Sequence, residues 1–486
     1  MYNSPEVTFP IALIMVTAID PCDAGKNWQV TIEMLPDNTL LEIFDFYRLD
    51  PVHRSGQSGG RPWKWHRLAH VCRRWRHIIY TSPRRLDLRI LCKSGKPIER
   101  VLGAWPTLPL VVGFRANSKS KSLPKNVVSA LRHTDRVCEI NLGVTTPMSQ
   151  SIANVIQVSF PVLERIRIWS KGAVELLVIN EFLGGFAPRL KEIHVGGVGI
   201  PFLALRRLLL STDNLVKLVL DRIPNSCYFS PDDLVTILSS MNYLKELVMR
   251  FLPPASRLTT NMDSPPPLER STRHFLISLD FYGASEYLEA FVARTHMPAL
   301  TTLTIRFFNQ AIFEIPQLYG FISRVEQLES FDEVSIAPTR EAVAILLQRK
   351  GKHSYEPVRC ILSVPCRQLD WQLSFTTQIF NQLSLLLSSA RLLIIDQRHA
   401  ISTGREDVDS AQWLELFQPL PNISEVRIYN DELISDVILA LAEDTAAGVL
   451  PRLGMLRVGG HHKSPSIIDA IRRIMAIRKL PSFAWY

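Results

Sequence analysis

The chain has 486 residues, of which 47% are hydrophobic and 21% are charged, and its formal net charge at pH 7 is +9. This balance is that of a globular protein and excludes wholesale disorder, while the length predicts two or more domains or one extended array. The seven cysteines are an odd number without a CxxC pair, so we expect no disulfide scaffold and a cytoplasmic or nuclear location.

The first 31 residues contain one apolar stretch, Phe9 to Ile19, which is about half as long as a membrane-spanning helix. A secretory signal begins with basic residues, but the first ten residues here contain Glu6 and no lysine or arginine. We therefore expect residues 1–31 to be a poorly ordered leader, or to add a strand to the first domain, and we expect no membrane association.

Helical signals begin at Leu35-Pro36-Asp37, because proline suits the first turn and an aspartate favours the positive end of the helix dipole. Apolar residues then recur at helical spacing up to residue 47, and again after a polar, glycine-rich loop over 51–64. The second run comprises Trp65, Leu68, Val71, Cys72, Trp75, Ile78 and Ile79. A helical domain is predicted over 32–92.

All of the net positive charge lies in one window, from Arg61 to Arg100, where twelve lysines and arginines stand against Asp87 and Glu99 and outside which the chain is close to neutral. A basic cluster of this kind is typical of nucleic-acid binding. An acidic protein partner would explain it equally well.

From residue 137 onwards the chain repeats a template, Pro-x-[Leu/Ile]-x-x-[Ile/Leu/Val]-x-[Ile/Val]. The full template occurs at 161–168, 188–195, 298–305, 421–428 and 451–458, and forms without the proline lie around Val137, Leu215, Leu244 and Leu276. A period of roughly 20–29 residues around L-x-x-L-x-L indicates leucine-rich repeats, each with one strand and one return helix. Because no unit can bury its apolar face alone, such units stack around a shared core.

The expected fold is therefore α/β: a short helical domain followed over 93–486 by an irregular leucine-rich-repeat-like solenoid of parallel strands and return helices. The asparagine or cysteine that caps the turn in regular repeats is mostly missing, which makes the array irregular. Between 306 and 420 we expect degenerate strands at Val334/Ile336, Leu369/Trp371 and Leu392/Ile394.

Three motifs have the letters of a catalytic or ligand site without its context. The G-x-S-x-G at 56–60, with Ser58, lacks the preceding strand and following helix of a nucleophile elbow. The glycines at 196–199 lack the third glycine of a dinucleotide loop, and His66 and His70 lack a third zinc ligand. We expect no enzyme activity, no cofactor and no metal.

The segment LPDNTLLEIFDFYRLD, followed by HRLAHVCRRWRHIIYTSP, resembles the F-box. In that family Leu-Pro opens the first helix, an apolar pair follows, and a V-[C/S]-[R/K]-x-W core closes the motif, although the loop over 51–64 is longer here. The continuation SPRRLDLRILCKSGKPIERVLGAWPTLPLVV, together with segments at 371–383 and 413–426, is similar to the large F-box family of mushroom-forming fungi.

This resemblance implies a non-catalytic substrate receptor of a Skp–cullin–F-box ubiquitin ligase, which docks through residues 35–79 on a Skp-type adaptor and through it on a cullin–RING ligase. The implied adaptor-binding residues are Leu35, Pro36, Leu40, Ile43, Phe44, Leu68, Val71, Cys72 and Trp75. Alternatively, these residues form only the core of a three-helix domain and bind no adaptor. The alternative function is nucleic-acid binding through 61–100.

The implied role of the repeats is to present a protein target. The residue between the last two apolar positions of each repeat strand points away from the core. These residues are Arg167, His194, Val219, Val248, Thr304, Arg427 and Arg457. Stacking of the repeats would align these residues in a row. Their arginines favour an acidic or phosphorylated target. The alternative is that the arginines only keep an exposed sheet soluble.

Overall fold

The chain divides into two compact units, Met1–Leu88 (unit 1) and Arg89–Tyr486 (unit 2). The computed structural model describes residues 32–49, 65–82, 86, 88–92, 98–105, 107–116, 122–170, 175–176, 179–253, 270–308, 315–349, 357–396, 409–429, 431–443, 448–459, 465–478, 480 and 482–485. The expected leader over 1–31 and the loop over 51–64, with Ser58, lie outside these residues. Unit 2 begins before the boundary predicted after residue 92, because β1 (Ile90–Cys92) pairs with β2 (Leu110–Arg115).

Unit 1 is helical, with the 3-10 turn η2 (Ile32–Met34) and the helices α1 (Asp37–Leu49), α2 (Trp65–Leu68) and α3 (Arg73–Thr81). The backbone N–H of Leu40 donates to the carbonyl of Pro36 at 3.1 Å, which starts α1 where the sequence predicts it. Cys72 caps α3, because its Sγ accepts the N–H of Trp75 at 3.4 Å. The helices share a core whose buried members are Leu40, Leu41, Phe44, Ile78 and Ile79.

Unit 2 is built on one sixteen-stranded sheet. In spatial order, its described strands are β1, β2, β3 (Val137–Val144), β4 (Arg165–Ser170), β6 (Glu192–Gly196), β8 (Lys217–Ile223), β9 (Glu246–Phe251), β11 (Ser278–Gly283), β13 (Thr302–Phe307), β16 (Val358–Pro365), β15 (Ala342–Arg349), β14 (Glu333–Pro338), β17 (Leu392–Ile395), β18 (Glu425–Ile428), β19 (Met455–Val458) and β20 (Ser482–Trp485). Two short pairs lie outside this sheet: β5 (Glu175–Leu176) with β7 (Val198–Gly199), and β10 (Ser271–Thr272) with β12 (Thr295–His296).

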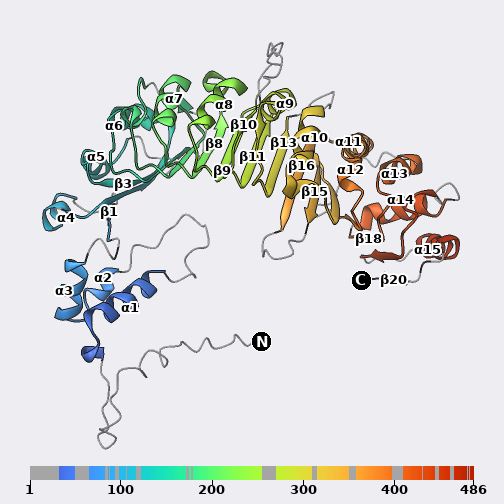
Figure 1. Ribbon diagram of the computed structural model, residues 1–486, viewed down its shortest axis with the longest axis horizontal. Helices are drawn as coiled ribbons and strands as arrows, with labels where there is room; N and C mark the ends of the chain where they lie inside the picture. Colours follow the sequence, from blue (N-terminus) through green and yellow to red (C-terminus); the bar gives the residue numbers. More distant parts are fainter. Residues whose placement is uncertain are drawn as a thin grey trace, which may run out of the picture. The chain divides into compact units, whose positions relative to one another are not determined.

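The helices of unit 2 line one face of this sheet, and the described helices leave the opposite face uncovered (Figure 1). They are α4 (Ile98–Ala104), α5 (Lys125–Leu131), α6 (Ser149–Ile156), α7 (Phe202–Leu210), α8 (Pro231–Ser239), α9 (Ser285–Ala293), α10 (Pro316–Ser323), α11 (Leu369–Gln382), α12 (Ser384–Leu387), α13 (Ser410–Phe417), α14 (Asp431–Leu441) and α15 (Pro465–Arg478). Short 3-10 turns complete several repeats: η4 (Thr146–Met148), η5 (Leu183–Gly185), η6 (Asn225–Cys227) and η7 (Glu326–Leu328).

The repeat template describes this architecture well. Its five full copies end in β4, β6, β13, β18 and β19, and the leading apolar residue of each copy is no more than 6% exposed. In β4, Ile166 and Ile168 are fully buried, whereas the intervening Arg167 is half-buried on the uncovered face. Unit 2 is therefore a leucine-rich-repeat-like solenoid of parallel strands and return helices, as predicted.

The parallel order is interrupted in the middle of the sheet. Strands β14, β15 and β16 form an antiparallel meander, and its outer strands β16 and β14 pair in parallel with β13 and β17, respectively. The meander keeps the sheet continuous while reversing the spatial order of three strands. Because both pairs that β15 makes are antiparallel, this part of the sheet departs from the expected stack of parallel strands.

The three degenerate strands expected between 306 and 420 have different outcomes. Val334 and Ile336 are fully buried in β14, as predicted. Leu392 and Ile394 lie in β17, but their neighbours Leu393 and Ile395 are the buried pair, so the predicted phase is wrong by one residue. Leu369 and Trp371 do not form a strand; they begin α11, in which Leu373, Thr376, Ile379 and Phe380 are buried at helical spacing.

Trp413 of α13 provides a test of the shared core, because its side chain is fully buried and packs 6.0 Å from the ring of Phe417. We expect Trp413→Ala to lower the free energy of unfolding by about 3–5 kcal/mol. Trp413→Phe should cost less, because it keeps an aromatic ring in the core; like the alanine change, it removes a buried indole N–H that lacks a partner among the described residues. The measurement is urea unfolding of the full chain followed by circular dichroism.

Leu385→Ala, at a side chain that is 73% exposed in α12, is the matched control and should change this free energy by less than about 0.5 kcal/mol. Equal unfolding midpoints for Trp413→Ala and Leu385→Ala would contradict the core assignment.

Candidate interaction surfaces

The aromatic pair of unit 1 belongs to its core. The rings of Phe44 and Trp75 meet edge to face with centroids 4.8 Å apart, and Phe44 is only 1% exposed. Leu40 is fully buried beside them in α1, and Leu68 and Trp75 are half-buried. Of the implied adaptor-binding residues, Leu40 and Phe44 therefore hold the helices together rather than present a surface.

Arg74 ties the start of α1 to α3. Its Nε and Nη2 donate to Oδ1 of Asp37 at 3.1 and 2.7 Å, and Nη2 also donates to the carbonyl of Leu35 at 2.6 Å. A partly exposed ion pair of this kind stabilises by about 1 kcal/mol at most, so its main effect is to orient the Leu35-Pro36 turn. Leu35 is half-buried and Pro36 is exposed in this turn.

A second set of apolar side chains in unit 1 faces solvent. Ile43 is 38% exposed and Val71 is 58% exposed, and Cys72 is also classed as exposed. Phe46, at 76%, follows Ile43 by three residues and so neighbours it on α1. Met34 and Ile32 of η2 are 57% and 49% exposed. We call Ile32, Met34, Ile43, Phe46 and Val71 the exposed apolar set.

The sequence prediction included Ile43 and Val71 but missed the other three residues of this set. The sequence already indicated that Phe46 is exposed. At 3.6 residues per turn, Phe46 lies on the side of α1 opposite Leu40, Leu41 and Phe44. An aromatic residue outside the apolar stripe of an amphipathic helix is a candidate contact for a partner.

The described arginines of the window between Arg61 and Arg100 differ in exposure and in their partners. Arg89 belongs to unit 2, is 7% exposed and pairs with Glu164 at 3.0 Å. Arg74 is bound to Asp37, and Arg76 donates to the carbonyl of Ala69 at 2.9 Å. Arg67 and Arg73 of unit 1 are exposed, and several other residues of the window lie outside the described residues.

The residues predicted for the target face lie in a single cross-strand row of unit 2. The strand register places Arg167 opposite His194, His194 opposite Val219, and Val219 opposite Val248. The row continues through Asp280, Thr304, Ile361, Leu346, Ser335, Ile394, Arg427 and Arg457. We call the face that carries this row the open face.

Arg167 lies far along the sheet from Arg427 and Arg457, which are neighbours on adjacent strands, and each arginine of the row is paired. Nine strands separate Arg167 in β4 from Arg427 in β18, a span on the order of 50 Å at about 4.8 Å per strand. Arg167 contacts Glu192 at 3.3 Å, and Arg427 and Arg457 share Glu425 at 2.7 Å each. The hydrogen bond between Glu425 and Arg427 lowers the pKa of the carboxyl and raises that of the guanidinium.

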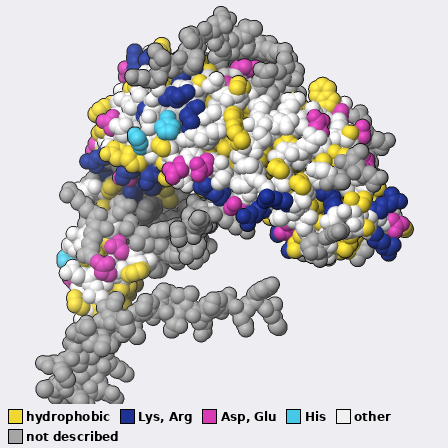
Figure 2. Space-filling view, turned by 45° about the vertical axis from the view of Figure 1, so that its right-hand side comes forward, with side chains coloured by type: hydrophobic (Ala, Val, Ile, Leu, Met, Phe, Trp, Pro, Cys, Tyr) yellow, Lys and Arg dark blue, Asp and Glu magenta, His cyan; other side chains and the backbone are white. Residues whose placement is uncertain are grey.

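A further chain of alternating charges crosses the middle repeats. Arg250 of β9 contacts Asp221 at 3.4 Å and Asp280 at 2.6 Å, and Asp280 also contacts Arg306 at 3.5 Å. Figure 2 shows acidic and basic side chains next to one another on the surface of unit 2. The charges of the open face largely neutralise each other, which favours the alternative that its arginines keep an exposed sheet soluble.

The meander gives the open face a different chemistry at its centre. There the row consists of Ile361, Leu346, Ser335 and Ile394, all half-buried, with aliphatic side chains at three of the four positions. Val219 and Val248, on the N-terminal side, are 7% and 8% exposed. The polar members His194 and Thr304 stand between these apolar positions and the charged ones. Burial, and then the adjacent Arg167, lower the pKa of His194.

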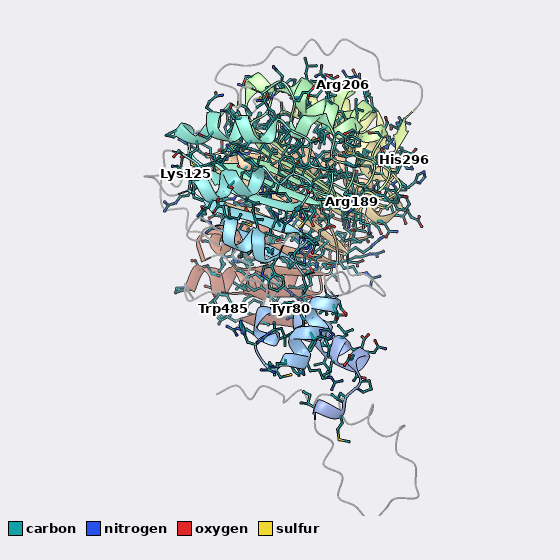
Figure 3. All side chains as sticks on the ribbon, turned by 90° about the vertical axis from the view of Figure 1, so that its left-hand side faces the viewer. Tyr80, Lys125, Arg189, Arg206, His296 and Trp485 are labelled. Carbon is teal, nitrogen blue, oxygen red and sulfur yellow. The ribbon has the colours of Figure 1, made fainter. Side chains whose placement is uncertain are left out.

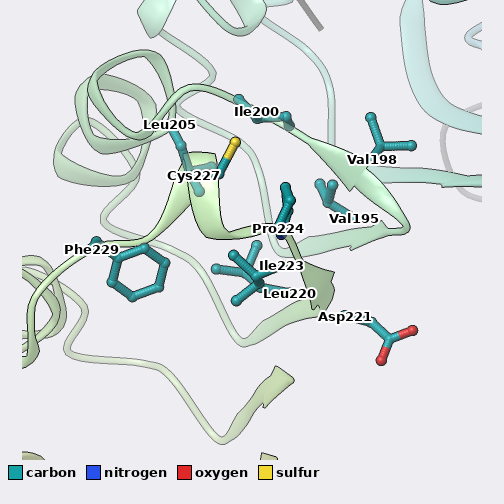
Figure 4. A pocket seen from close by; sticks show the side chains of 10 residues that line it. All are labelled: Val195, Val198, Ile200, Leu205, Leu220, Asp221, Ile223, Pro224, Cys227 and Phe229. Carbon is teal, nitrogen blue, oxygen red and sulfur yellow. The ribbon is translucent and has the colours of Figure 1, made fainter. Parts of the chain in front are cut away.

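The pocket between β6, β7 and β8 offers no catalytic set. Its lining is mainly hydrocarbon, and Figure 4 shows the carboxylate of Asp221 directed away from the other side chains. Burial raises the pKa of the Cys227 thiol in this pocket, which keeps it protonated near neutral pH. A protonated thiol is a poor nucleophile.

The glycine-rich segment at 196–199 joins β6 to β7 through a bend at Gly197. Gly197 has φ of +63°, a conformation that favours glycine, and its N–H donates to the carbonyl of Asp221 at 2.9 Å. Among the described residues, no three His, Cys, Asp or Glu side chains are placed to hold a metal ion. No helix in the described part of the chain is long and apolar enough to cross a membrane.

Comparison with known proteins yields no family assignment. No protein-family model matches the chain, and no curated protein matches it. Among solved structures, the chain is similar to the leucine-rich repeat-containing protein LegL7 from Legionella pneumophila, at 11% sequence identity. That match covers 80% of this chain and 98% of LegL7, with a TM-score of 0.29. The fold assignment therefore rests on the strand register and helix placement of this chain.

The pairing of Glu425 makes a testable contribution to stability. Because the folded-state pKa of Glu425 is lowered, its stabilisation is present above the unfolded pKa of about 4.3 and is lost as pH falls through the folded-state value. We expect Glu425→Gln to lower the free energy of unfolding by about 1 kcal/mol or less at neutral pH. Urea unfolding at neutral pH and at about pH 3 should show this difference shrinking. A difference that is the same at both pH values would contradict the pairing.

Proposed function

We propose that this protein is a non-catalytic substrate receptor of the Skp–cullin–F-box type, similar to the F-box proteins of mushroom-forming fungi. In this proposal unit 1 docks on a Skp-type adaptor, and through it on a cullin–RING ubiquitin ligase, while unit 2 holds the target. The proposal rests on the F-box-like sequence and on the surface of unit 1, and it assigns no chemical step to this chain.

The observation that carries the proposal is the exposed apolar set on unit 1. Phe46 and Val71 are 76% and 58% exposed, although the unit has a separate core around Phe44. A domain that has filled its core gains no folding stability from such side chains, so their burial against a partner is the use that physical chemistry supports. The Leu35-Pro36 turn, held by Arg74, borders the same helix.

The partner for this set would be an apolar groove bordered by acidic side chains. Arg67 and Arg73 are exposed on unit 1 and would favour an acidic partner by long-range attraction. Nucleic-acid binding through 61–100 is less well supported, because Arg89 is buried in unit 2 and Arg74 and Arg76 are engaged within unit 1.

For the target, the proposal favours the centre of the open face. The charged positions on either side are paired within the sheet, so binding there would have to break existing ion pairs. The aliphatic positions Ile361, Leu346 and Ile394 have no such competition. A target segment with apolar side chains fits this surface better than the acidic or phosphorylated segment that the arginines of the row suggest when only the sequence is considered.

Docking is tested with Ile43→Asn and Val71→Asn, which remove apolar contact without adding charge. If each side chain is buried in the complex, each change should cost about 1.5–3 kcal/mol, or about tenfold or more in Kd. The measurement is the Kd for a purified Skp-type adaptor, with circular dichroism to check that the full chain remains folded. The double variant should bind at least about a hundredfold more weakly.

Leu203→Asn is the matched control, because Leu203 is 68% exposed on α7 of unit 2. It should bind the adaptor as the unchanged protein does. If the double variant retains full affinity, adaptor docking through this surface is wrong. Salt-sensitive binding of single-stranded or duplex nucleic acid that is lost in Arg67→Gln/Arg73→Gln would then support the alternative.

A further inference from the structure

Two arginines and two histidines interact electrostatically around the pairing of β10 with β12 in unit 2: Arg270, His274, His296 and Arg324. The register places Thr272 opposite His296, and the N–H of Arg273 donates to the carbonyl of His296 at 2.7 Å. Figure 3 labels His296 at the outer edge of unit 2. We call these four side chains the cationic cluster.

Arg324 is the member with the most unsatisfied hydrogen-bonding capacity. It follows α10 as its C-cap, where its backbone N–H donates to the carbonyl of Phe321 at 3.1 Å. The Nε and Nη2 atoms of its guanidinium are buried and have no hydrogen-bond acceptor among the described residues. Burial and the nearby Arg270 lower the pKa of Arg324. Buried donors without acceptors are costly, and an anion is the partner that would satisfy both the donors and the charge.

The neighbours of His296 are basic side chains. Burial, and then Arg324, His274 and Arg270, lower the pKa of His296, and no described carboxylate is among the groups that shift it. Other described charged groups on the adjoining elements are engaged elsewhere or exposed. Arg294 is bound to Asp232 at 2.6 Å, Arg273 donates to Leu238 and Ser271, and Glu326 of η7 is exposed.

Backbone bonds hold this arrangement in place. Arg270 Nε donates to the carbonyl of Ala293 at 3.1 Å, next to the end of α9, and the two parallel strands fix the spacing of residues 270–274 against residues 294–296. These bonds fix the backbone of the cluster within the repeat framework, and the side chains of Arg270 and His274 are exposed on it.

We propose that the cationic cluster is a binding site for a tetrahedral dianion of the phosphate class. Guanidinium groups bind such oxyanions through paired, charge-assisted hydrogen bonds, and imidazolium groups add further donors. The cluster supplies two guanidinium and two imidazole groups at one edge of unit 2. This site is separate from the adaptor surface on unit 1 and does not depend on that proposal.

Binding at this site should be coupled to protons. A bound dianion favours the charged form of His296, so binding raises its pKa and takes up protons. Affinity therefore increases as pH falls. Sulfate is the appropriate probe for this effect, because it remains a dianion throughout the range in which histidine titrates, whereas phosphate does not.

The experiment is calorimetric titration of the full chain with sodium sulfate at constant ionic strength, at about pH 6 and about pH 8. We expect saturable binding that is tighter at the lower pH. Arg324→Gln and His296→Gln should each weaken binding about tenfold or more, and His296→Gln should also reduce the pH dependence. Arg189→Gln, at an exposed arginine that precedes β6, is the matched control and should bind as the unchanged protein does.

The source of the dianion is distinguished by titrating inorganic phosphate and a phosphoserine peptide in parallel with its unmodified form. Tighter binding of the phosphopeptide than of phosphate indicates a modified protein segment, and equal binding indicates free phosphate. The proposal is overturned if sulfate binding does not saturate, or if folded Arg324→Gln and His296→Gln bind sulfate as Arg189→Gln does.

Discussion

The structure of unit 2 depends on one constraint: no single repeat can bury its apolar side chains without the next. Backbone hydrogen bonds connect successive repeats. The N–H of Lys191 donates to the carbonyl of Glu164, the N–H of Val216 to the carbonyl of Lys191, and the N–H of Lys245 to the carbonyl of Val216, each at 2.8 Å. This ladder holds neighbouring strands in one register. The same register stacks the buried residues of successive strands into a continuous apolar layer, whose loss at any one repeat would expose its neighbours.

That register also determines what the open face can bind. Because the strands are aligned residue by residue, opposite charges on adjacent strands meet, as Arg250 does with Asp280 at 2.6 Å. Most of the described charged side chains of the sheet form ion pairs of this kind. A partner that binds them would have to break an existing ion pair. Among the described residues, the two functional arguments for unit 2 concern the aliphatic positions Ile361, Leu346 and Ile394 of the open face and, outside the main sheet, the cationic cluster near β12.

In unit 1 the division between core and surface follows helix geometry. Leu40, Leu41 and Phe44 lie on one side of α1 and are buried, whereas Ile43 and Phe46 lie on the other and are exposed. The F-box-like motif contains residues of both kinds, and this is why a stripe read from the sequence could serve equally as a core or as a docking surface. Side-chain exposure separates the two roles for each residue.

The sequence by itself determined the solenoid, because the repeat template at a spacing of 24 to 32 residues is a local pattern that only stacked strands and return helices satisfy. It also determined that Arg167, His194, Arg427 and Arg457 would share one row, because alternation along a strand is a local property. Only the tertiary structure decided the antiparallel meander and the helical state of residues 369–382, since a short apolar run fits a strand or a helix until its neighbours are known. Only the tertiary structure likewise brought Glu425 to Arg427 and Arg457, and Arg324 to His296, because residues paired through the register of separate strands and helices carry no common signal in the sequence.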